Sequence, residues 1–181
     1  RERLEKMNMV IGTFFSEVGQ GLLSRIVTCD PGRDSLNLAI AGSLRNGENF
    51  TAMKTAVAAH PFTCIPTPGD IGEIHHFLHT RRDFLLRLLE NPVLLEHQGF
   101  TSLLQATFHL AEELGRRGSF EGLPGADQRH LAGDISRVYG QLAGEWVRYI
   151  AYLNRNYPYL YSLAVRTNPF DPGASVIIPE K

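Results

Sequence analysis

The first 27 residues impose the strongest constraint on the fold, because their apolar side chains recur every three or four positions. This spacing is typical of one apolar face on a helix with about 3.6 residues per turn and predicts a helix over about residues 2–27. Further apolar side chains widen that face, so we expect this helix to contact neighbours on two sides. The face is defined by Leu4, Met7, Ile11, Phe14, Val18, Leu22 and Ile26.

The same periodicity continues along the chain, interrupted by segments that contain proline and glycine. It predicts long helices over about residues 70–89, 101–114 and 127–153, and an Asp-x-x-Glu capping box formed by Asp70 and Glu73 begins the first of them. No pair of strands is predicted, and mostly short connections favour antiparallel neighbours. We therefore expect an all-α fold, in which residues 1–181 form a single-domain antiparallel bundle of about six to eight helices. An extended C-terminal tail follows, with Val176, Ile177 and Ile178 packed on the bundle.

The composition excludes several classes of protein. Lys and Arg total 18 and Asp and Glu total 19, giving a net charge of -1, so we expect no nucleic-acid partner. Two cysteines, Cys29 and Cys64, form no metal-binding or disulfide pattern, which favours free thiols in the cytosol. The most apolar stretch, residues 9–27, contains too many polar residues to span a membrane. Because the chain begins with a charged helical segment, we expect it to be a fragment of a longer protein.

A cluster of histidines on the helix predicted over residues 70–89 is the first candidate for chemistry. His75 and His79 are four residues apart, so their imidazoles share one helix face. Glu73 and His76 form a Glu-x-x-His pair, the spacing found on the inward faces of di-iron bundles. These four residues are the candidate ligands of a metal site.

Two further pairs have the same four-residue spacing: His109 with Glu113, and His130 with Asp134. A helical bundle could in principle bring such pairs together into a binuclear site. The pattern places both pairs on the polar sides of their helices, away from the apolar stripe, whereas interior metal ligands should interrupt that stripe. We therefore expect these side chains to be solvated.

Nucleophilic catalysis has less support. No Gly-x-Ser-x-Gly motif is present, and Cys64 lies in a proline-rich loop close in sequence to the histidine cluster. A Cys/His pair across that loop is one alternative, and a small buried hydrophobic side chain is the other.

The opening segment carries a resemblance. Residues 2–19, with the sequence ERLEKMNMVIGTFFSEVG, and the later His60-Pro61-Phe62 and histidine cluster resemble a family of uncharacterised bacterial membrane-anchored proteins. In this family a hydrophobic N-terminal anchor precedes a cytoplasmic helical region. The resemblance implies an inner-membrane anchor upstream of Arg1 and a location on the cytoplasmic side of that membrane. The family has no assigned activity, so no catalytic residues carry over.

Three functional hypotheses follow. The leading one is a non-enzymatic cytoplasmic scaffold, sensor or regulatory domain of a membrane-anchored bacterial protein, with a protein partner or a second copy and no cofactor. The second is a metal-binding bundle that uses His75 and His79, with Glu73 and His76, for redox or hydrolytic chemistry. The third is a small-molecule sensor with a pocket near the proline-rich loop and the tyrosine-rich final helices.

Overall fold

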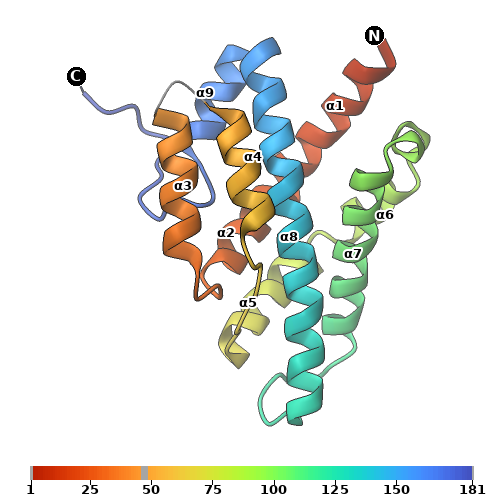
Figure 1. Cartoon of the computed structure of the whole chain (residues 1–181). Helices are drawn as coiled ribbons and strands as arrows, with labels where there is room; N and C mark the ends of the chain where they lie inside the picture. The colour runs from red at the N-terminus through yellow and green to blue at the C-terminus, as the bar shows by residue number, and fades with distance from the viewer. Residues whose placement is uncertain (1, 46–48, 181) are drawn as a thin grey trace.

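A computed structural model describes residues 2–45 and 49–180, and these residues contain helices, turns and irregular segments but no strand (Figure 1). Because α1, η1 and α2 run on as one helical rod, the described residues form eight α-helical rods, which confirms the predicted all-α fold. The elements are α1 (Glu2–Phe14), the π-helix η1 (Phe15–Gly19), α2 (Gln20–Val27), α3 (Arg33–Arg45), α4 (Phe50–Ala59), α5 (Pro68–His79), α6 (Arg82–Leu89), the 3₁₀ helix η2 (Pro92–Glu96), α7 (Gln98–Gly115), α8 (Gly125–Asn156) and α9 (Pro158–Arg166).

Helix α8 is the longest element, with 32 residues, and it contacts α1, α2, α4, α7 and α9 (Figure 1). Its buried face recurs at the predicted helical period and includes Trp146, the largest fully buried side chain. After the connection at residues 116–124, the first half of α8 runs back alongside α7. The positive φ of Gly122, 69°, lies in this connection, where an L side chain would be strained. This antiparallel packing brings polar side chains of α7 and α8 together at the candidate site described below.

A π-helical turn in the first rod explains its wide apolar face. The rod winds more loosely at Phe15–Gly19, as single π turns do inside α-helices. Phe14 and Phe15 are both buried, although they are adjacent in sequence, because neighbouring helices cover both sides of the rod. Arg81 Nε donates a hydrogen bond to the Glu17 carbonyl oxygen at 2.7 Å, which ties this turn to the end of α5.

The structure corrects two predictions about the helix over residues 70–89. Its cap is not the predicted Asp70/Glu73 pair: Thr67 is the N-cap, its hydroxyl accepts from the Asp70 N–H at 3.1 Å, and Asp70 accepts from the Thr67 N–H at 2.8 Å. Pro68, at the first helical position, fixes the start two residues earlier than the pattern suggested. The helix also breaks at residues 80–81 into α5 and α6.

The tail packs on the bundle through a different residue from those predicted. Phe170 is fully buried, and its ring lies 5.2 Å from that of Trp146. Val176, Ile177 and Ile178 are instead 57–72% exposed, so the prediction that they pack on the bundle is wrong. The Phe170 ring buries a large apolar area against the core tryptophan, whereas the three aliphatic side chains stay mostly in contact with solvent.

A buried carboxylate, Asp30, joins three segments of the chain. Asp30 is 1% exposed, and its Oδ2 accepts from the Tyr139 hydroxyl at 2.6 Å and lies 2.7 Å from His60 Nε2. Its Oδ1 accepts from the Gly32 N–H at 2.7 Å. The α2–α3 connection, the segment after α4 and the middle of α8 therefore meet at one carboxylate, whose oxygens are satisfied as burial requires.

Both cysteines lie close to this carboxylate, as buried free thiols. Burial raises the pKa of Cys29 to about 11 and that of Cys64 to about 12. A nucleophilic cysteine needs a lowered pKa and access to solvent. The described geometry therefore favours the small buried hydrophobic side chain over a Cys64/His catalytic pair.

Replacing Tyr139 with Phe removes the hydroxyl from Asp30 without changing the packing of the ring. We expect the free energy of unfolding to fall by about 1.5–3 kcal/mol, because hydrogen bonds to charged groups contribute that much. Urea unfolding measures the change, and Tyr159→Phe is the control because Tyr159 is 92% exposed. Equal stability of the two variants would show that the Asp30 centre contributes nothing to folding.

The two thiols should react with a water-soluble disulfide reagent only after unfolding. Burial holds both pKa values above the usual 9.0, so very little thiolate forms near pH 8. We expect no labelled cysteine in the native protein and two per chain in denaturant. Rapid labelling of either cysteine in the native protein would contradict this assignment and restore Cys64 as a candidate nucleophile.

Candidate metal centre

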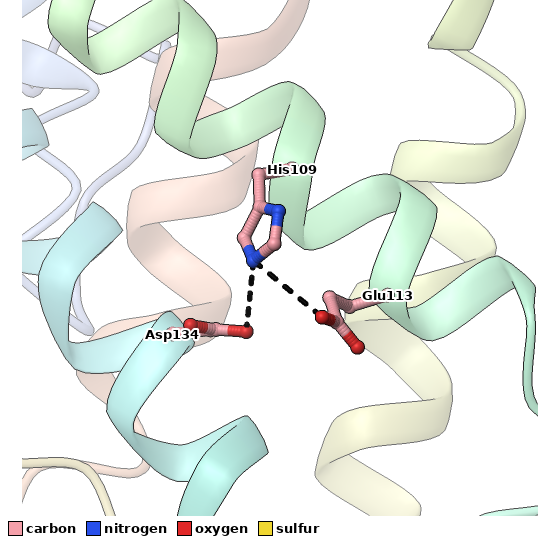
Figure 2. Close-up of side chains that lie close together, drawn as sticks. All are labelled: His109, Glu113 and Asp134. Atoms are coloured by element: carbon pink, nitrogen blue, oxygen red, sulfur yellow. Dashed lines mark ion pairs between the residues drawn. The ribbon is translucent and has the colours of Figure 1, made fainter.

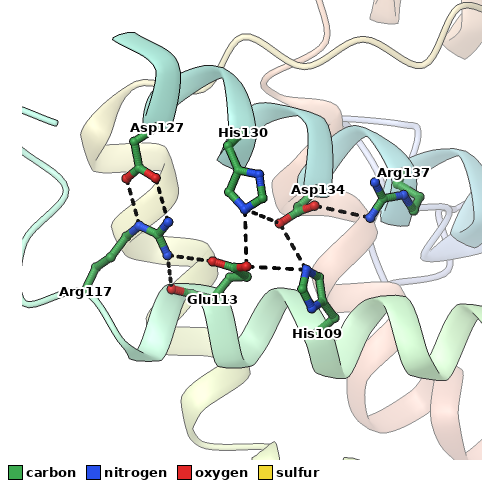
Figure 3. Close-up of polar contacts among 7 residues, drawn as sticks. All are labelled: His109, Glu113, Arg117, Asp127, His130, Asp134 and Arg137. Carbon is green, nitrogen blue, oxygen red and sulfur yellow. Dashed lines mark hydrogen bonds and ion pairs between the residues drawn. The ribbon is translucent and has the colours of Figure 1, made fainter. Parts of the chain in front are cut away.

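The antiparallel packing of α7 on α8 brings the two four-residue pairs together. His109 and Glu113 extend from α7, and His130 and Asp134 extend from α8 (Figure 3). We call these four residues the α7–α8 cluster. Each pair lies on one face of its helix because residues four apart are neighbours on a helix surface. Helix packing then places the two faces opposite each other.

The four side chains form a closed ring of nitrogen and oxygen atoms. His109 Nε2 lies 3.6 Å from Glu113 Oε1 and 3.4 Å from Asp134 Oδ2 (Figure 2). His130 Nε2 lies 3.2 Å from the same glutamate oxygen and 3.4 Å from the same aspartate oxygen (Figure 3). Each imidazole therefore faces both carboxylates, and each carboxylate presents one oxygen to both imidazoles.

Asp134 is the buried member of this ring. It is 4% exposed, and its Oδ2 accepts no hydrogen bond among the described residues. The prediction that the His130/Asp134 pair is solvated is wrong for Asp134, because α7 covers this edge of α8. A buried carboxylate oxygen without a hydrogen bond costs free energy. A positively charged ligand at this point would remove that cost.

Charged neighbours hold Glu113 in place. Arg117 NH1 donates to Glu113 Oε2 at 2.9 Å, and the same guanidinium makes two bonds to Asp127, at 2.6 and 2.9 Å. The Arg117 guanidinium, followed by His130, lowers the pKa of Glu113, and Arg117 also lowers that of Asp127. Glu113 is therefore ionised at neutral pH, as a metal-ligating carboxylate must be.

The cluster has the donor chemistry of a transition-metal site. One ligand atom from each of His109, Glu113 and Asp134 lies within 4.8 Å of the others, the only such group of three found among the described residues. Imidazole and carboxylate donors suit Zn²⁺, Co²⁺, Ni²⁺ or Fe²⁺. The histidine side chains are 49% and 48% exposed, so an ion can enter from solvent.

The predicted histidine site on α5 has a different geometry. The rings of His75 and His79 lie 5.7 Å apart at 45°, and His75 also contacts Phe120 at 5.6 Å. Burial, with a smaller effect of His79 and His76, lowers the pKa of His75. In the part of the chain that the structure describes, neither Glu73 nor His76 joins these rings in a three-donor group. A metal site on α5 stays a prediction.

Two surface pockets bear on the small-molecule hypothesis. One, of about 680 Å³, lies between the start of α1 and the η2–α7 region, and includes Arg3, Lys6 and His97. The other, of about 450 Å³, lies between α2, α3 and the tail. Neither is lined by the proline-rich loop or by tyrosines of α8 and α9, where the hypothesis placed a pocket.

Comparison with known proteins places the chain in an uncharacterised family. It is 44% identical over 177 residues to the uncharacterised protein MJ1433 of the archaeon Methanocaldococcus jannaschii. The matched region covers 98% of this chain and 71% of MJ1433. No solved structure matches the chain significantly. None of the described helices is both long and apolar enough to cross a membrane.

These findings do not support the resemblance suggested by the opening segment to a bacterial membrane-anchored family. MJ1433 is an uncharacterised archaeal protein. A family model named for the C-terminal helical domain of MJ1433 matches residues 3–166, most of the chain. The chain therefore belongs to the MJ1433 family and corresponds to its C-terminal helical domain.

Proposed function

We propose that this chain is a metal-binding regulatory domain in which one divalent transition-metal ion joins α7 to α8. The observation that carries the proposal is the buried Oδ2 of Asp134, which accepts no hydrogen bond and faces two imidazoles and a second carboxylate. This proposal departs from the expectation of no cofactor. It keeps the expectation of a non-enzymatic sensor or regulatory domain, and location in the cytoplasm stays a prediction. Membrane attachment is not part of it.

The physical effect of the ion would be to hold two helices together. The α7–α8 connection spans residues 116–124, and the cluster lies beyond it, between the helices themselves. A ligand that binds only the folded state stabilises it by RT ln(1 + [L]/Kd), about 2.7 kcal/mol at one hundred times Kd. Metal availability would thereby set the stability of the α7–α8 pair, which is the property a regulatory domain can use.

Zinc binding by the chelator-treated protein tests this proposal. We expect the protein to take up one Zn²⁺ per chain and its Tm to rise. Asp134→Asn keeps the side-chain volume but removes the charge, and we expect it to weaken zinc binding by more than the roughly 10–100-fold that loss of an outer-shell partner costs. Isothermal titration and elemental analysis measure both quantities.

The double variant His75→Ala/His79→Ala is the matched control, because it removes two histidines from α5 and leaves the cluster intact. Zinc bound by this control and lost in Asp134→Asn supports the α7–α8 site. The reverse result would place the metal on α5, as the sequence predicts. A wild-type protein that binds no zinc, cobalt or nickel would overturn metal binding at both sites.

A second candidate function is association with a partner through α9. No residue of this helix is buried, and it exposes Tyr159 by 92%, Leu160 by 51% and Leu163 by 43%. Contiguous exposed apolar side chains mark interaction surfaces on soluble proteins. This observation supports the prediction of self-association or a protein partner, and a second copy of the chain is the simplest occupant to test.

Substitution on α9 should change the oligomeric state but not the stability. We expect the wild-type protein to be a dimer by light scattering at micromolar concentration and Tyr159→Ser/Leu160→Ser to be a monomer with unchanged unfolding. Leu38→Ser is the control, because Leu38 on α3 is 70% exposed. A wild-type monomer would contradict self-association through this face.

A further inference from the structure

The fourth member of the cluster, His130, lies against both carboxylates, as His109 does. Its Nε2 lies 3.2 and 3.4 Å from the two carboxylate oxygens, and the corresponding distances from His109 are 3.6 and 3.4 Å (Figure 3). A tetrahedral shell with bonds of about 2.0–2.1 Å has edges of roughly 3.3–3.4 Å. Four of the six edges of such a shell, at 3.2–3.6 Å, are near that length before any ion is present. With His130 included, the four donor atoms do not all lie within 4.8 Å of one another, so the remaining edges must shorten when an ion binds.

Each carboxylate has only one oxygen to offer an ion. Glu113 Oε2 accepts from Arg117 at 2.9 Å, and Asp134 Oδ1 accepts from Arg137 at 3.2 Å. Arg117 is itself fixed by Asp127, so its bond to Glu113 is not free to turn away. Charge-assisted bonds of this kind are strong and geometrically specific. Both arginines therefore oppose bidentate coordination by the carboxylates.

Monodentate carboxylates and two imidazoles discriminate between ions. Ca²⁺ takes 6–8 oxygen ligands and commonly uses a bidentate carboxylate, while Mg²⁺ requires six oxygen ligands in near-ideal octahedral geometry. Zn²⁺ accepts nitrogen and oxygen donors in a four-coordinate tetrahedron. Four protein donors leave no position for a reactive water, which is the property of a structural or sensing site rather than a hydrolytic one.

We infer that the α7–α8 cluster is a closed four-coordinate site for a Zn²⁺-like ion, with His130 as the fourth ligand. Arg117 and Arg137 set its selectivity by holding the second oxygen of each carboxylate. This inference rests on the proposed metal-binding function and adds the coordination number, the class of ion and the residues that exclude Ca²⁺ and Mg²⁺.

Cobalt is the probe for the coordination number, because four-coordinate Co²⁺ absorbs visible light far more strongly than five- or six-coordinate Co²⁺. We expect the wild-type protein with Co²⁺ to show the intense bands. His130→Ala should still bind Co²⁺, with lower affinity and weak bands, because the opened site admits two or more waters and raises the coordination number to five or six. His76→Ala is the control, since His76 is an exposed histidine on α5 outside the cluster.

Selectivity is measured by competition of Ca²⁺ and Mg²⁺ against Zn²⁺. Arg117→Met frees Glu113 Oε2, so we expect Ca²⁺ to compete at least about tenfold better than in the wild type. Arg116→Met is the matched control, because Arg116 is 80% exposed and pairs with Glu112 instead. The two substitutions are the same change at adjacent positions directly after α7.

The outcomes separate this inference from the proposed function. A wild-type protein that binds no Co²⁺ overturns both. Weak bands in the wild type, or intense bands that persist in His130→Ala, overturn the closed four-coordinate site and leave metal binding standing. Equal Ca²⁺ competition in Arg117→Met and Arg116→Met overturns the role of the arginine, whereas intense bands lost in His130→Ala together with raised Ca²⁺ competition support the whole inference.

Discussion

The packing of α7 along α8 is the constraint on which the site depends. The i, i+4 spacing on each helix sets which residues share a face, but only the antiparallel contact of the helices places one face against the other. Leu110 and Leu114 on α7 are fully buried, as are Leu131 and Ile135 on α8. The buried apolar faces of the two helices, to which these four residues belong, hold α7 against α8, and the polar cluster lies beside them.

The same packing explains why an unfavourable group is tolerated. Asp134 directly precedes the fully buried Ile135, so an apolar contact that stabilises the fold also carries a carboxylate out of water. Its Oδ1 is satisfied by Arg137, but Oδ2 is not satisfied by any hydrogen bond among the described residues. Natural proteins retain such local costs mainly where the group has a function. The cost of burying Asp134 Oδ2 is the physical reason for the metal ion that we propose.

Much of the fold follows from the periodicity of the sequence, and the departures have identifiable causes. The apolar stripe of residues 127–153 predicts α8 to within a few residues, because one helix face carries nearly all of its core contacts. The π turn at Phe15–Gly19 was not predicted, since the apolar spacing of residues 2–27 is that of a regular α-helix. At the site, the spacing of His109/Glu113 and His130/Asp134 was visible in the sequence. The burial of Asp134 was not, because its position at the edge of the apolar stripe reads as polar and only the neighbouring helix decides whether it is covered.

One short stretch of α8 carries three polar attachments to different parts of the chain. Asp134 faces α7, the Ser136 hydroxyl accepts from the Cys64 N–H at 3.0 Å, and the Tyr139 hydroxyl donates to Asp30. These attachments lie within six residues, on a helix whose backbone bonds make it move as one body. On the proposed function, an ion bound between α7 and Asp134 would therefore also restrain the proline-rich segment and the α2–α3 connection, because all three are attached to the same stretch of α8. The α7–α8 cluster is thereby connected to the buried Asp30 centre through α8, and this connection is what the proposed regulatory role requires.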